Sequence, residues 1–219
     1  MPVAVNGREL EMLMALAVRK EATPRARLAA MLWPDLEESA ARNVFSVCLH
    51  RLRTHVKRED AIERIGDGYR LHAHASVDLW ELERVLSKPR KKAALGERDR
   101  QTMERLWSGL CEDPPVRSEQ WEWFESTAVR LREARVELAR ILGEDALARS
   151  DVASALRYSG DAVEFDRCDE QAVEIGIRAH LLAGDRAAAM RHYRQYRNAL
   201  HAELGAEPSF SLTALVTTA

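Results

Sequence analysis

An internal repeat with a period of 34 residues most strongly limits how this chain can fold. Within one 17-residue window, six positions carry the same residue one period later, well above chance even in a chain rich in Ala and Arg. The pairs are Ile141/Ile175, Leu147/Leu181, Asp151/Asp185, Ala153/Ala187, Ala155/Ala189 and Arg157/Arg191. Such a period is typical of stacked helix pairs, and the small alanines permit close helix crossings. One pair cannot bury its own apolar face, so neighbouring units stack and leave a concave surface.

Composition agrees with a mainly α fold. Only 10 Gly and 7 Pro interrupt 219 residues, whereas Ala, Leu, Arg and Glu, all good helix formers, dominate. An apolar content of 46% excludes wholesale disorder. From about Ser118 the chain becomes helical again, with apolar residues at helical spacing and one gap at Arg135. These residues are Trp121, Phe124, Ala128, Leu131, Leu138 and Leu142.

Three short amphipathic helices are predicted near the N-terminus, after a short start at Pro2–Asn6. The first runs from Arg8 to Lys20. The second has Thr23 as its N-cap, Pro24 in its first turn and Pro34 after its end. The third spans Glu38 to Lys57. Their expected apolar faces are Leu10, Leu13, Met14 and Ala17; Leu28, Met31 and Leu32; and Phe45, Leu49, Leu52 and Val56.

A hairpin follows the third helix. Ala61–Ile65 and Tyr69–His72 flank Gly66-Asp67-Gly68, where glycine can supply the positive φ values of a tight turn. Three helices followed by a hairpin indicate a winged helix-turn-helix. Another helix is expected at Val77–Leu86, with Asp78 near its start.

Ser87–Gln101 is the best candidate for a domain boundary, because it combines a proline, a glycine and dense charge with little periodicity. A solvated linker is the preferred interpretation of this run, and a phosphate-contacting tether is the alternative. We therefore predict a winged helix-turn-helix over residues 1–76 and a tetratricopeptide-like helical repeat domain over residues 77–219.

The formal net charge is −2, but the charge is unevenly distributed. Residues 1–75 hold 12 basic and 10 acidic side chains, and Ala40–Arg58 holds five basic residues and no acid. No apolar run is long enough for a membrane span or a signal peptide. Three widely spaced cysteines fit neither a disulfide framework nor a thiolate zinc site. We expect a soluble, cytoplasmic protein that does not bind membranes.

Five segments carry a family resemblance. LAAMLWPD (Leu28–Asp35), AARNVFSVCLHRLR (Ala40–Arg53) and GDGYRL (Gly66–Leu71) resemble an OmpR/PhoB-type winged helix, in the version found in SARP-like bacterial transcriptional activators. VDLWELERVL (Val77–Leu86) and AGDRAAAMRHYRQYRNALHAELGAEPS (Ala183–Ser209) resemble the bacterial transcriptional activator domain of the same family.

The resemblance implies an activator of transcription that binds direct repeats in promoter DNA head to tail, self-associates there and contacts RNA polymerase. Family members usually begin with a fuller β-sheet than VAVNG (Val3–Gly7), so either the sheet is reduced or the chain is part of a longer regulator. Asp166-Arg167 and Gly176-Ile177 depart from the usual repeat pattern, which predicts a less sharply formed concave groove.

In a helix-turn-helix, the outward side chains of the second helix meet base edges in the major groove of double-stranded DNA. The expected base-reading residues are Asn43, Val47, His50, Arg51 and Thr54. Residues expected to contact phosphates or to form the wing are Arg25, Arg27, Arg42, Lys57, Arg58, Arg64, Gly66, Gly68 and Arg70. Arg51 suits guanine, Asn43 suits adenine, and Val47 can touch a thymine methyl group.

Other chemistry finds little support. No phosphate-binding loop, nucleophile elbow or dinucleotide fingerprint occurs, so neither an enzyme nor a cofactor is expected. His72 and His74 lack the further ligands of a metal site, and Glu122, Glu125 and Glu133 are expected on helix surfaces. Packing is the preferred role of the five tryptophans. The competing hypothesis is a protein-binding adapter whose repeats carry the function and whose winged helix serves packing or dimerisation.

Overall fold

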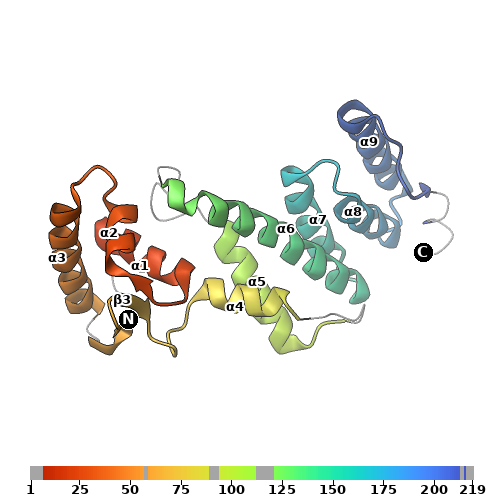
Figure 1. Cartoon of the computed structure of the whole chain (residues 1–219). Coiled ribbons are helices and arrows are strands. Elements are labelled where there is room, and N and C mark those ends of the chain that lie inside the picture. The colour runs from red at the N-terminus through yellow and green to blue at the C-terminus, as the bar shows by residue number, and fades with distance from the viewer. Residues whose placement is uncertain (1–6, 57–58, 89–93, 112–120, 213–214, 216–219) are drawn as a thin grey trace. The chain divides into compact units, whose positions relative to one another are not determined.

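The computed structural model describes residues 7–56, 59–88, 94–111, 121–212 and 215 (Figure 1). The chain divides into two compact units, residues 1–83 with 114–128 and residues 84–113 with 129–219. The described elements are mainly helices with one small antiparallel sheet. This confirms the predicted mainly α class, with a winged helix-turn-helix followed by a helical repeat. The domain limits 1–76 and 77–219 stay a prediction, and the start at Pro2–Asn6 lies outside the described residues.

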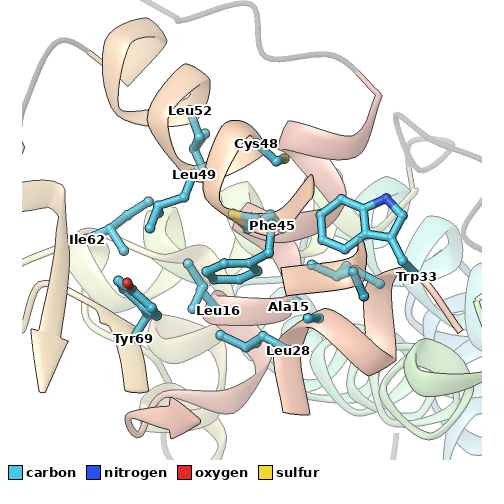
Figure 2. Close-up of a cluster of buried hydrophobic side chains, with 14 of the residues drawn as sticks. Ala15, Leu16, Leu28, Trp33, Phe45, Cys48, Leu49, Leu52, Ile62 and Tyr69 are labelled. Atoms are coloured by element: carbon cyan, nitrogen blue, oxygen red, sulfur yellow. The ribbon is translucent and has the colours of Figure 1, made fainter. Parts of the chain in front are cut away.

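The first unit packs three helices against a three-stranded sheet. Its elements are α1 (Arg8–Arg19), β1 (Thr23–Pro24), α2 (Arg25–Leu32), α3 (Glu38–Val56), a 3-10 turn (Glu59–Ala61), β2 (Ile62–Ile65) and β3 (Gly68–Leu71). The strand order is β1-β3-β2, and both pairings are antiparallel. Phe45, Leu49 and Leu52 of α3 enter the core beside Ile62 and Tyr69 (Figure 2). The predicted apolar face of α3 is therefore confirmed.

The buried face of α1 differs from the prediction. Met12, Ala15 and Leu16 are fully buried, whereas Leu10, Leu13, Met14 and Ala17 are only partly covered. Apolar side chains surround most of this helix, so spacing alone left its inward face ambiguous. Contacts with α2, α3 and β3 decide the face instead.

The sequence predicts Thr23 as the N-cap of α2, and this prediction is wrong. Thr23 pairs with Tyr69 in the sheet, and its hydroxyl donates to the carbonyl of Glu21 at 3.3 Å. The N-cap position belongs to Pro24, which makes no side-chain capping bond. A residue that precedes proline is biased toward extended backbone, which explains why Thr23 joins a strand.

The hairpin turn consists of Gly66 and Asp67, and its two glycines have different roles. Gly66 has a φ of +62°, so it supplies the positive φ that was expected. Gly68 has no positive φ and already belongs to β3. A Cβ atom on Gly68 would lie 2.9 Å from the carbonyl oxygen of Thr23, so glycine at this position permits the close approach of β1.

The described tryptophans pack against protein, as expected. Trp33, Trp107 and Trp121 are buried. In α4 (Asp78–Leu86), Trp80 donates its indole N–H to the carbonyl of Ala17 at 2.7 Å. Trp123, in the 3-10 turn Glu122–Phe124, stacks on Trp121 with ring centroids 5.3 Å apart.

The second unit carries the helical repeat. Its helices are α5 (Glu97–Cys111), α6 (Glu125–Ala148), α7 (Val152–Phe165), α8 (Glu170–Leu182) and α9 (Arg186–Leu204), of which α6 begins within the residues of the first unit. Asp151 and Asp185, one period apart, both act as N-caps and accept from backbone N–H groups three residues later. Ala155 and Ala189 are likewise both fully buried. The repeated residues thus perform the same local task twice.

The interpretation of Ser87–Gln101 as a linker was wrong in its last third, because α5 begins at Glu97. Residues 89–93 lie outside the described part of the chain. The backbone N–H of Leu95 donates to the Asp145 carboxylate at 2.7 Å, and Arg100 pairs with the same carboxylate at 3.2 Å. Asp145 is buried, so these contacts fix the start of α5 to the repeat domain.

The apparent gap at Arg135 is filled by an ion pair rather than by an apolar contact. Arg135 pairs with Asp161 of α7, and its guanidinium lies 4.9 Å from the ring centroid of Phe165. Asp161 also accepts from the indole of Trp107 in α5 at 3.0 Å. One carboxylate therefore connects α5, α6 and α7.

Gly176 lies where α7, α8 and α9 converge. A Cβ atom at Gly176 would meet the Ser159 hydroxyl at 2.5 Å and would also clash with the ring of His192. Burial, followed by the charge of His180, lowers the pKa of His192. The glycine that departed from the expected repeat pattern is therefore required by close helix packing.

Candidate nucleic-acid interface

The five residues predicted to read bases lie together on one exposed face of α3. Asn43, Val47, His50, Arg51 and Thr54 are all exposed. At 100° per residue they fall within an arc of about 100°. Phe45 and Leu52, on the opposite face, are fully buried. The ring centroids of Phe45 and Tyr69 lie 5.3 Å apart. Core packing therefore holds this face outward on a rigid helix.

Val44 belongs to the same face and was missed from the sequence. Its side chain is 39% exposed, and that of Val47 three residues later is 52% exposed. Residues three apart on a helix are neighbours, so the two valines form an apolar patch beside Arg51. The spacing from Val47 was the available signal.

Part of the basic stripe on α3 is engaged within the protein. Arg42 pairs with Glu38, and Arg53 donates to the carbonyl of Ile62 at 2.7 Å. His55 lies 2.7 Å from the carboxylate of Glu9. Arg51 differs from these residues, because it is exposed and has no hydrogen-bond or ion-pair partner among the described residues. Lys57 and Arg58, two of the predicted phosphate contacts, lie outside the described residues.

Arg25 connects three parts of the helix-turn-helix. Its guanidinium donates to the carbonyl of Arg42 and to the hydroxyl of Ser46, both at 2.6 Å. Its backbone N–H donates to the carbonyl of Asp67 in the hairpin turn at 3.1 Å. Arg25 thus fixes the start of α2 relative to both α3 and the wing. Arg27, two residues later, is exposed.

The wing carries two arginines in different electrostatic surroundings. Arg64 is exposed and donates to the carbonyl of Gly66 at 3.1 Å. Arg70 forms an ion pair with Glu63 on the neighbouring strand at 2.8 Å, and His72 lies 3.3 Å from the same carboxylate. Arg64 is therefore better placed than Arg70 to meet an external anion.

Residues considered for other chemistry have contrasting surroundings, since Cys48 is buried and the glutamates Glu122, Glu125 and Glu133 are exposed. Burial, with a smaller contribution from Glu9, raises the pKa of the Cys48 thiol to about 11, so this thiol stays protonated at neutral pH. Glu122, Glu125 and Glu133 are exposed on helix surfaces. Across the described residues there is no cluster of three or more His, Cys, Asp and Glu that could hold a metal ion.

The second unit contains a hollow between α6 and α8. It has a volume of about 590 Å³ and an apolar floor that includes Ile141, Leu147 and Ile175. Glu144 and Arg178, one repeat period apart, pair across it at 2.9 Å. This hollow, called the α6–α8 groove, therefore combines apolar and charged side chains, and the concave surface of the repeat stays a prediction.

A model of the family described as "bacterial transcriptional activator domain" matches residues 77–218. Among solved structures, the fold is similar to that of Mycobacterium tuberculosis EmbR in complex with a low-affinity phosphopeptide. The TM-score is 0.67 and the sequence identity is 18%. The match covers 99% of this chain and 59% of the EmbR chain, so this chain spans about three fifths of that protein. A search of curated proteins gave no match.

No helix within the described ranges is both long and apolar enough to cross a membrane. The family comprises regulators rather than enzymes. Its model matches well over half of the 219 residues, including all five helices of the repeat unit. The chain therefore belongs to the bacterial transcriptional activator domain family, a family of transcription regulators.

Proposed function

We propose that this protein is a sequence-specific DNA-binding activator of transcription whose helix α3 enters the major groove. The exposed face of α3 carries the proposal. It combines Arg51, which has no ion-pair partner among the described residues, with amide, imidazole, hydroxyl and aliphatic groups on one helix. An α-helix fits the major groove, where each base pair presents a distinct pattern of donors and acceptors. The family assignment of residues 77–218 and the EmbR-like fold support a regulator of this class.

Each group on α3 has a natural counterpart in the groove. The Arg51 guanidinium can donate twice to guanine O6 and N7, and the Asn43 amide can pair with adenine N6 and N7. His50 and Thr54 add single hydrogen bonds, although the Thr54 hydroxyl also donates to the carbonyl of His50 at 3.0 Å. Val47 supplies apolar contact to a thymine methyl group.

Phosphate contacts fall to exposed cations around this face. Arg27 and Arg64 are exposed, and Arg42 can exchange its partner Glu38 for a phosphate at the helix start. Arg25 serves best as a positioning residue, since one nitrogen of its guanidinium donates to both Arg42 and Ser46 within the fold. Lys57 and Arg58 complete the proposed set, with Arg70 and the glycines Gly66 and Gly68 shaping the wing.

Activation would then require contact with the transcription machinery. We propose that copies of the chain bind direct repeats head to tail, that they self-associate on DNA, and that the helical unit contacts RNA polymerase. EmbR itself was solved in complex with a low-affinity phosphopeptide. The groove between α6 and α8 is one surface of this chain on which a protein partner could be accommodated.

Selection of bound fragments from a random duplex library, performed at two salt concentrations, tests the proposal. Enrichment of a motif, with affinity that falls as salt rises because counterions are released, is expected. Binding that is weak and indifferent to sequence would favour the alternative, a protein-binding adapter whose winged helix serves packing or dimerisation.

A further inference from the structure

Helix α9 presents a strip of positive charge that is separate from the residues proposed to bind DNA. Between Arg186 and Ala202 the helix contains four arginines and no acidic residue. All four side chains, Arg186, Arg191, Arg194 and Arg197, are exposed. Within the described part of the chain none of them forms an ion pair.

Among the described residues, the four arginines of α9 contrast with three arginines on or beside α6 that form ion pairs. Arg135 and Arg140 of α6, and Arg149 directly after its end, are each paired with an aspartate. Residues 76–219 as a whole carry more acidic than basic side chains. Like charges three or four residues apart repel one another on a helix. Among the described residues, no ion pair therefore offsets the charge of the four arginines between Arg186 and Ala202.

Apolar surface lies in the middle of this strip. Met190 is 44% exposed, and Arg186, Arg194 and Arg197 fall within an arc of about 80° around it. A hollow of about 350 Å³ is lined by Met190, Arg194 and Arg197 of this strip, and also by Tyr193, Asn198 and Leu212. The Tyr193 hydroxyl lies 3.4 Å from the carbonyl of Phe210, which holds one wall of the hollow in place.

We infer that this surface, the α9 strip, binds an acidic protein segment that carries an aliphatic or aromatic anchor. Carboxylates can accept paired hydrogen bonds from the guanidinium groups. An apolar side chain of the same segment can occupy the hollow beside Met190. Arg, Met and Tyr are enriched in protein interfaces, whereas a phosphate backbone offers nothing apolar for Met190 and Leu212 to contact. A protein partner therefore fits better than DNA, and the inference does not depend on α3 binding DNA.

Fluorescence anisotropy with the full chain and a labelled peptide of sequence DELLDEFLEE tests this inference. Two control peptides separate charge from apolar contact: NQLLNQFLQQ lacks the acids, and DESSDESSEE lacks the anchors. Saturable binding is expected for DELLDEFLEE, with both controls at least about tenfold weaker. Equal binding of either control peptide would overturn the inference.

Variants locate the site. The double variant Arg194→Glu/Arg197→Glu should weaken DELLDEFLEE binding about tenfold or more, and Met190→Ser should weaken it severalfold at unchanged net charge. Arg132→Glu, an exposed arginine on α6, is the matched control and should stay within about twofold of the wild type. Unchanged circular dichroism verifies folding. An unaffected double variant, or an equal loss for Arg132→Glu, would contradict the site.

A duplex of about 20 base pairs with random sequence provides the DNA arm of the same experiment. If the double variant loses affinity for this duplex and keeps its affinity for DELLDEFLEE, the α9 strip contacts DNA and the inference is overturned. If the double variant loses affinity for DELLDEFLEE only, the inference is supported, whether or not α3 binds DNA.

Discussion

At the scale of single residues, the absence of a side chain at Gly68 allows strand β3 of the hairpin to pair closely with β1. The Cα hydrogen of Gly68 faces the backbone of Thr23, and both the oxygen and the carbon of that carbonyl lie within about 3 Å of where a Cβ would be. The neighbouring Gly66 has open space around it and needs glycine only for its φ of +62°. The two glycines therefore respond differently to substitution.

Gly68→Ala should lower the free energy of unfolding by about 1–3 kcal/mol, because backbone atoms must shift to admit the methyl group. Gly66→Asn is the matched control, and since Asn tolerates the left-handed region it should cost less than about 1 kcal/mol. Urea denaturation followed by circular dichroism measures both. A Gly68→Ala variant as stable as the wild type would show that β1 can move away freely.

Val44 and Val47 make a second prediction at this scale, which rests on the proposed function. Replacing thymine by deoxyuridine removes only the methyl group that an exposed valine would contact. In the duplex enriched by selection, at least one such replacement should weaken wild-type binding severalfold. The same replacement should have little effect on Val44→Ala/Val47→Ala. The measurement is the affinity of each protein for the thymine duplex and for the deoxyuridine duplex. If the wild type and the double alanine variant show the same ratio of these affinities, the valines do not contact the methyl group.

At the scale of elements, the predictability of each helix depended on how distinct its apolar stripe is. The buried residues Phe45, Leu49 and Leu52 of α3 are interrupted by polar residues, so their spacing alone identified both faces. In α1 almost every position from Leu10 to Val18 is apolar. Tertiary contacts, and not spacing, determine that Met12 and Leu16 are the buried residues.

Helix α5 was missed for a different reason. Charged residues at its start, including Arg98 and Asp99, resembled a solvated linker. Its buried residues Met103, Leu106 and Trp107 have helical spacing, which was the overlooked signal. The docking of its first turn depends on the carboxylate of Asp145, about 45 residues away, and no local pattern indicates such a contact.

The meeting of α7, α8 and α9 at Gly176 gives a prediction for the repeat. Gly176→Ala should destabilise the protein by about 1–3 kcal/mol, since the methyl group would displace Ser159 and His192. Gly160→Ala on α7 is the matched control, because nothing lies within 4 Å and alanine favours the helix. It should be neutral or stabilise the protein by up to about 1 kcal/mol. Thermal unfolding of both variants checks the contrast, and equal effects would argue against tight packing at Gly176.

At the scale of the whole molecule, repetition and charge distribution carried more information than any single motif. The 34-residue period placed Asp151 and Asp185 at equivalent helix starts, where both act as N-caps. The surplus of basic side chains in Ala40–Arg58 pointed to α3. Its internal partners, such as the Ile62 carbonyl for Arg53, could be assigned only in three dimensions. The base-reading role of Asn43, Val47, His50, Arg51 and Thr54 stays a prediction.

The most direct measurement of the central claim is a duplex selection carried out in parallel with the wild type, Arg51→Ala and Arg98→Ala. Arg51 lies on the exposed face of α3, whereas Arg98 is an exposed arginine of α5 that serves as the matched control. The wild type and Arg98→Ala should enrich the same motif. Arg51→Ala should lose preference at one guanine-containing position, at a cost of about 1–3 kcal/mol in discrimination. Identical motifs and affinities for all three proteins would contradict the assignment of α3 as the reading helix.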